Sequence, residues 1–149
     1  MLAIAATAAL TALVTGPSPA LKPAAVVQAQ LEALAAGDVA TCFAFASPNN
    51  KKATGPWQRF EMMVRQTPAY SPLVSCTSFE ILSALSLSED RWQARVAVKP
   101  AGSSSAPFAI ANPQCYFTWM LSKQAESEGE VAGCWMVDGV MPDTPTMEG

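Results

Sequence analysis

The hydrophobic pattern of the chain changes period near Cys76, and this change limits the fold more than any other feature. Before it, apolar residues recur at helical spacing, and Val27, Leu31 and Leu34 form a stripe at i, i+4 and i+7. After it, apolar and polar residues alternate, most clearly over residues 91–99. Helices followed by strands predict an α+β domain in which the helices cover one face of a sheet.

The helical half predicts three helices, and the alternating half predicts four strands. The first helix is expected to end at Gly37, with Asp38 placed to cap a second helix over residues 39–46. A third begins near Pro56, whose missing N–H is tolerated in a first turn, and ends before Pro68. We expect a loop over residues 47–52 and strands over residues 79–87, 91–99, 115–122 and 133–141. Because the loops between successive strands are short, the strands are expected to form an antiparallel meander.

Residues 1–20 are interpreted as a hydrophobic targeting segment that is cleaved from the mature protein. The first 14 residues are apolar apart from threonine, and small residues follow at Ser18 and Ala20, which suits signal-peptidase cleavage. The apolar run is shorter than the ~20 residues of a membrane-spanning helix, so no stable span is expected after processing. The folded part is then a single α+β domain over residues 23–142, followed by a frayed tail over residues 143–149.

Histidine is absent from the sequence, and this absence removes several kinds of chemistry. Ser-His-Asp and Cys-His catalysis, histidine-ligated zinc and haem, and histidine pH switches all need that side chain. No base is present to activate Ser47, which is interpreted as a loop or cap residue. A net charge of −3 offers no basic patch for phosphate contacts, so no nucleic-acid partner is expected. The four cysteines lack C-x-x-C spacing, so no metal or other cofactor is expected; disulfide pairing and core packing both stay open.

Three motifs follow one another in the first half of the chain: Phe45-Ala46-Ser47-Pro48, Gly55-Pro56-x-x-Arg59-Phe60-x-x-Met63-Val64-Arg65 and Tyr70-x-Pro72-Leu73. In this order and spacing they resemble the domain-of-unknown-function 4864 family. Two later motifs resemble the form of that family found in plants and algae: Phe117-Thr118-Trp119-x-Leu121-x-Lys123-Gln124 and Gly133-Cys134-Trp135-Met136. The resemblance covers nearly the whole of residues 23–142.

The resemblance implies a cone-shaped, nuclear-transport-factor-2-like fold, with N-terminal helices packed on a curved antiparallel sheet and a cavity between the two layers. It implies no catalytic or binding residues, because relatives with this fold include isomerases, dehydratases, hydrolases and non-catalytic binding modules. With the hydrophobic leader, the plant-type motifs predict a plastid location, the thylakoid lumen included, with secretion as the alternative. Sequencing the mature N-terminus tests this, since an intact Met1 would contradict cleavage.

Four residues are candidates for ligand binding. Arg59 and Arg65 lie beside an apolar helix face and are suited to hold a carboxylate at the mouth of the cavity. The alternatives are a helical ion pair with Glu61 for Arg65, and a solvated or loop-bracing role for Arg59. Trp57 and Trp119 are candidates for lining an apolar pocket, and their alternative is simple packing in the core or an interface.

Asp138 is the weak candidate for acid–base catalysis, with Tyr70 or Tyr116 as its partner. A carboxylate and a phenol that converge in a pocket can transfer protons, because burial raises the pKa of a carboxyl group. Strict strand alternation places Asp138 and Met136 on the face opposite Val137, away from the core. This pattern favours a strand-end or turn role for Asp138.

Three functions remain open, and the sequence favours a non-catalytic one. The first is a module that binds a small apolar or carboxylate ligand or a protein partner, with dimerisation through the exposed sheet face. The second is a small-molecule isomerase or dehydratase that uses the carboxylate–tyrosine pair. The third is a structural homo-oligomeric assembly domain, which would need a buried interface of ~1,000 Å² or more.

Overall fold

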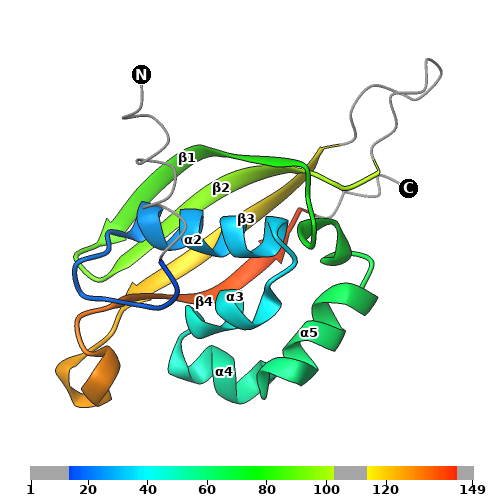
Figure 1. The fold of residues 1–149 in the computed structure, drawn as a ribbon. Coiled ribbons are helices and arrows are strands. Elements are labelled where there is room, and N and C mark those ends of the chain that lie inside the picture. Colours follow the sequence, from blue (N-terminus) through cyan, green and yellow to red (C-terminus); the bar gives the residue numbers. More distant parts are fainter. Residues whose placement is uncertain (1–13, 103–113, 144–149) are drawn as a thin grey trace, which may run out of the picture.

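The computed structural model describes residues 14–102 and 114–143, in which helices form one layer and strands the other (Figure 1). The helical elements are α2 (Pro23–Ala35), α3 (Val39–Ala44), α4 (Pro48–Thr54), α5 (Trp57–Gln66) and the 3₁₀ turn η1 (Ser71–Leu73). The strands are β1 (Ser78–Ser88), β2 (Arg91–Lys99), β3 (Cys115–Lys123) and β4 (Trp135–Pro142), with the 3₁₀ turn η2 (Glu126–Val131) before β4. The predicted α+β fold, with helices packed on a curved antiparallel sheet, is confirmed.

The sheet is a simple meander in the order β1-β2-β3-β4, with every neighbouring pair antiparallel, as predicted. In the centre of the sheet Ala94 pairs with Trp119 and Val96 pairs with Phe117. All four side chains are buried, and they belong to the same core as Leu31 of α2. The alternation of β2 and β3 therefore positions the apolar face of the sheet against the helices.

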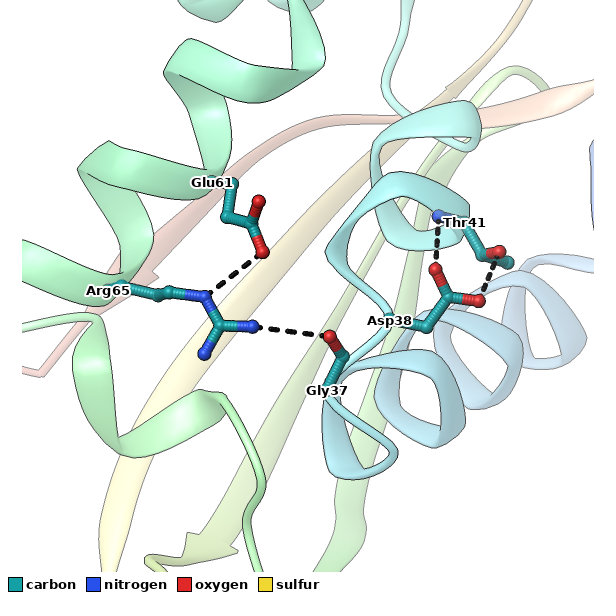
Figure 2. A network of polar contacts seen from close by, with 5 residues as sticks. All are labelled: Gly37, Asp38, Thr41, Glu61 and Arg65. Carbon is teal, nitrogen blue, oxygen red and sulfur yellow. Dashed lines mark hydrogen bonds and ion pairs between the residues drawn. The ribbon is translucent and has the colours of Figure 1, made fainter.

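The turn between α2 and α3 is set by Gly37 and Asp38. Gly37 has φ = +76°, and its N–H donates to the Leu34 carbonyl while the N–H of Asp38 donates to the carbonyl of Ala33, which closes the C-terminus of α2. The Asp38 carboxylate accepts from the backbone N–H of Thr41 (3.1 Å) and from its hydroxyl (2.6 Å), as Figure 2 shows. The predicted helix end and cap are confirmed.

The prediction of a loop over residues 47–52 is wrong, because α4 occupies this segment. Ser47 caps the helix by accepting from the N–H of Asn50 (3.4 Å), and Pro48 fills the first helical position. The Pro-Asn-Asn-Lys-Lys composition resembles a loop, but the same residues are compatible with a short helix once Ser47 and Pro48 begin it. The cap role of Ser47 is as expected.

The outer edge of β4 is covered by the segment that joins α3 to α4. Ala46 forms a parallel bridge with Val137. The N–H of Val137 donates to the Phe45 carbonyl, and the Val137 carbonyl accepts from the N–H of Ser47 (2.8 Å) and from Nδ2 of Asn50 (3.1 Å). These bonds fasten the helical layer to the sheet at one point.

The opposite edge, β1, pairs only with β2 in the part of the chain that the structure describes. Its pairing register shifts at Leu82 and Leu87, each of which is an extra residue relative to β2. These two side chains and Leu85 are exposed. Among the described residues, the sheet therefore has one covered edge, β4, and one open edge, β1.

The predicted targeting segment lies mostly outside the described residues, and so does most of the predicted tail. Val14 and Leu21, which follow the undescribed part, pack against the core. Across residues 14–102 and 114–143, none of the helices has the length and apolar character needed to cross a bilayer.

Candidate binding pocket

A pocket of about 260 Å³ lies between the helices and the β3–β4 side of the sheet. One wall comes from α2, α3, α4, α5 and η1 with their connections, and the other comes from β3 and β4. The lining is mainly apolar, and no Lys, Arg, Asp or Glu among the described residues contributes to it. The pocket is therefore suited to an uncharged molecule.

Gln30 is the most deeply buried polar group of the pocket. It lies on the core side of α2, where its Nε2 donates to the Cys42 carbonyl (2.8 Å) and its Oε1 accepts from Trp119 Nε1 (2.7 Å). Because a carbonyl only accepts and an indole N–H only donates, the two partners determine the orientation of the amide. This chain of bonds links α3, α2 and β3 across the inner end of the pocket.

The hydroxyl and amide donors of three further lining residues are also used within the fold. Tyr70 Oη donates to the Val140 carbonyl (3.0 Å), and Thr54 Oγ1 donates to the carbonyl of Asn50 (2.7 Å). Asn50 Nδ2 donates to the Val137 carbonyl (3.1 Å). Each donor is paired with a backbone carbonyl, so these side chains are held in fixed positions.

Cys42 also lines the pocket, and its thiol stays neutral. Burial raises the pKa of the Cys42 thiol to about 12, with the nearby Asp38 carboxylate adding to the shift. A thiolate is the reactive form of cysteine, so Cys42 has no nucleophilic character at neutral pH. All four cysteines are unpaired in this structure, and Cys42, Cys76 and Cys134 are buried.

The mouth of the pocket is bordered by methionine. Met63 on α5 and Met141 at the end of β4 both line the pocket, yet their side chains are 41% and 55% exposed. Thr67, at the end of α5, is the exposed polar residue beside them. Flexible methionine side chains can move aside or adapt to the shape of an entering molecule.

Of the predicted binding residues, Trp119 lies in the pocket and the others lie outside it. Trp57 and Arg59 are exposed on α5. Arg65 forms the ion pair with Glu61 that was its alternative (Nε–Oε2, 3.0 Å) and donates from Nη2 to the Gly37 carbonyl (3.3 Å; Figure 2). It therefore braces α5 against the α2–α3 turn.

The structure does not bring the carboxylate and the tyrosines together. Tyr70 lines the pocket, whereas Asp138 is exposed in the middle of β4 and Tyr116 is exposed on β3. The register of β3 and β4 shifts between Met120 and Leu121, which leaves Asp138 as an extra residue in a bulge. The expectation that Met136 faces away from buried surroundings is wrong, since Met136 and Val137 are both fully buried, although the core cluster contains Val137 and not Met136. Within the described residues, no group of three or more Cys, Asp or Glu side chains could hold a metal ion.

The residues that sequence reasoning missed are Gln30, Asn50 and Thr54, which all contribute to the pocket. Gln30 was visible as a polar residue within the apolar stripe of its helix, at the spacing of Val26, Val27 and Leu34. Asn50 lies in the segment that was predicted to be a loop, and Thr54 lies just after it, before the predicted third helix.

The fold and its pocket define an α+β domain with a mainly apolar cavity between helices and sheet. Residues 20–141 match the family model described as "Domain of unknown function (DUF4864)", and the chain belongs to this family, as its motifs predicted. Comparison with curated proteins finds no match. A solved NTF-2-like protein of unknown function from Shewanella oneidensis is similar at 16% identity, over 78% of this chain and 92% of that chain, with a TM-score of 0.48.

Proposed function

We propose that this domain is a non-catalytic module that binds one small, uncharged, largely apolar molecule in the pocket between helices and sheet. The observation that carries the proposal is the lining itself, which holds about 260 Å³ of space and no charged side chain. An apolar site excludes charged ligands, because it offers nothing to replace their hydration. The pocket contains a phenol, Tyr70, but no carboxylate to exchange protons with it, which disfavours acid–base chemistry there.

The proposal predicts that naphthalene binds and that filling the pocket removes this binding. A dry cavity of about 150 Å³ accepts benzene, so a pocket of about 260 Å³ suits a two-ring compound. Val140→Phe adds a ring to the lining and should weaken naphthalene binding at least about tenfold in a titration followed by protein NMR. The matched control is Val131→Phe on η2, since Val131 is equally half-buried but lies outside the pocket.

Two outcomes would contradict this function. Failure of naphthalene to bind the unmodified protein would mean that the space is only loose packing. Equal affinity for the Val140→Phe variant and the unmodified protein would place the probe elsewhere on the molecule. Circular dichroism of both variants checks that the fold is kept.

We also propose that the domain self-associates through β1, because the open edge of the sheet is apolar. Leu82, Leu85 and Leu87 are exposed there, and Glu80 is the one charged residue of the strand. An edge strand without lysine or proline is a template for pairing with another strand. Antiparallel pairing of two copies about Ser83 would place Glu80 opposite an uncharged serine, so no like charges would meet.

Light scattering coupled to size-exclusion chromatography tests this association. Leu85→Lys is expected to convert the dimer to a monomer, because the charge would be buried in the contact. Met62→Lys is the matched control, since Met62 is equally exposed but lies on α5. A monomeric unmodified protein, or dissociation by the control alone, would refute the β1 contact.

A further inference from the structure

Three oxygens of the polar lining keep unused acceptor capacity, and the second N–H of the Asn50 amide is a donor that no hydrogen bond among the described residues uses. Four side chains of the lining donate to backbone carbonyls: Gln30, Asn50, Thr54 and Tyr70. Trp119 Nε1 donates to Gln30 Oε1. None of these bonds uses a lone pair of Asn50 Oδ1, Thr54 Oγ1 or Tyr70 Oη within the described residues. The capacity that remains at these three oxygens is therefore acceptor capacity.

The orientation of the Asn50 amide follows from its partner. The Val137 carbonyl can only accept, so the amide must present Nδ2 to it, and Oδ1 is directed elsewhere. Tyr70 is held in the same way, because its hydroxyl hydrogen points at the Val140 carbonyl. Reversing the Asn50 amide would place Oδ1 against the Val137 carbonyl, two acceptors with no hydrogen between them, and turning the Tyr70 hydroxyl away would break its bond to the Val140 carbonyl.

We propose that the ligand is an uncharged, mainly apolar molecule that carries an O–H or N–H donor, and that Tyr70 Oη accepts this hydrogen bond, with Asn50 Oδ1 and Thr54 Oγ1 available to a second donor. The inference rests on the proposed binding function and adds the chemical class of the ligand to it. Neutral phenols, alcohols and indole-like N–H compounds belong to this class. Carboxylates and phosphates, which are charged and only accept, do not.

The positions of the arginines agree with this class. Arg65 is committed to Glu61 and to the Gly37 carbonyl, and neither it nor Arg59 lines the pocket. An anion in the pocket would face acceptor oxygens and no cation. The carboxylate ligand suggested by the sequence is therefore disfavoured on electrostatic grounds.

A matched series of two-ring probes separates these alternatives. The probes are naphthalene, 2-naphthol, 2-methoxynaphthalene and 2-naphthoate, each titrated into the full chain at neutral pH and followed by protein NMR. We expect 2-naphthol to bind about 3- to 10-fold tighter than naphthalene, which is the gain from one buried hydrogen bond. The methoxy compound should not exceed naphthalene, and naphthoate should bind more than about 100-fold more weakly than naphthol.

Tyr70→Phe identifies the acceptor, with Tyr116→Phe as the matched control on the exposed face of β3. Tyr70→Phe should remove the advantage of 2-naphthol over naphthalene, because the acceptor oxygen is lost. Tyr116→Phe should leave the ratio of the two affinities unchanged.

The results distinguish this inference from the function on which it rests. If naphthalene and 2-naphthol both fail to bind, the binding function itself is wrong. If naphthalene binds and 2-naphthol binds equally or more weakly, the pocket binds apolar molecules but the donor requirement is refuted. An unchanged naphthol advantage in Tyr70→Phe also refutes it.

Discussion

Gln30→Leu is expected to lower the free energy of unfolding by about 1–3 kcal/mol, although leucine is similar in size and more apolar. The substitution leaves Trp119 Nε1 without a partner inside the core, and it removes one donor from the Cys42 carbonyl, which keeps the N–H of Phe45 (3.2 Å). An unsatisfied buried donor costs about 1–3 kcal/mol, and the apolar surface that leucine adds offsets only part of this cost. Urea denaturation followed by tryptophan fluorescence measures the change.

Gln28→Leu is the matched control, because Gln28 lies on the exposed side of the same helix and should change stability by less than about 0.5 kcal/mol. The double variant with Trp119→Phe tests the pair directly. It removes both partners of the indole bond, so its loss should be smaller than the sum of the two single losses by about 1 kcal/mol or more. Strictly additive losses, or a Gln30→Leu variant as stable as the unmodified protein, would contradict a structural role for this bond.

The layer order was predictable because it depends on periodicity, which is a local property of the chain. The alternation of Trp92, Ala94 and Val96 determines which face of β2 is buried, and the structure has these residues in the core. The Gly37–Asp38 turn was also predictable, since glycine at a helix end and an aspartate cap act within a few residues. Residues 47–52 were predicted to be a loop because their composition is typical of loops. The structure has α4 there, capped by Ser47 and bonded to β4 through Asn50.

The candidate site was predicted less well, because its geometry depends on contacts between distant segments. Arg59 and Arg65 were predicted to bind a ligand because of their charge. An arginine on a short helix can instead pair with an acidic residue one turn away, as Arg65 does with Glu61. Gln30 and Trp119 are 89 positions apart, and no local pattern connects them. A polar residue within an apolar stripe indicates a buried hydrogen bond but does not name the partner.

Strand alternation predicted the exposure of Asp138 but not the burial of Met136. A period of two assigns faces correctly only while the register is regular, and a bulge inserts one residue and changes the assignment beyond it. The shift opposite Met120 and Leu121 changes the faces of the residues after Asp138, whereas Met136 and Val137 precede it, pair in regular register with Ser122 and Leu121, and are both buried. Gly139 directly follows Asp138, and a glycine within a strand is the sequence signal that favours such a bulge.

Phe45→Ala is expected to lower the free energy of unfolding by about 3–5 kcal/mol. Phe45 is fully buried at the end of α3, and its carbonyl accepts from the N–H of Val137. Removing the ring leaves a cavity at the point where the helical layer is fastened to β4. The amides of Ser47 and Val137 should therefore exchange with solvent faster than the amides of β2.

Phe43→Ala is the matched control, since the two rings are two residues apart on the same short helix. Phe43 is only half-buried, and its ring centroid lies 5.3 Å from that of Phe60. Truncating Phe43 should therefore lower the free energy of unfolding by about 1–2 kcal/mol. Equal losses of unfolding free energy for the two variants would mean that the contact of Phe45 with β4 does not stabilise α3 beyond the helix itself. A larger loss of unfolding free energy for Phe45→Ala, with faster amide exchange confined to Ser47 and Val137, would show that this junction stabilises the pocket. Ala46 and Val137, which form the junction, are also part of the pocket wall.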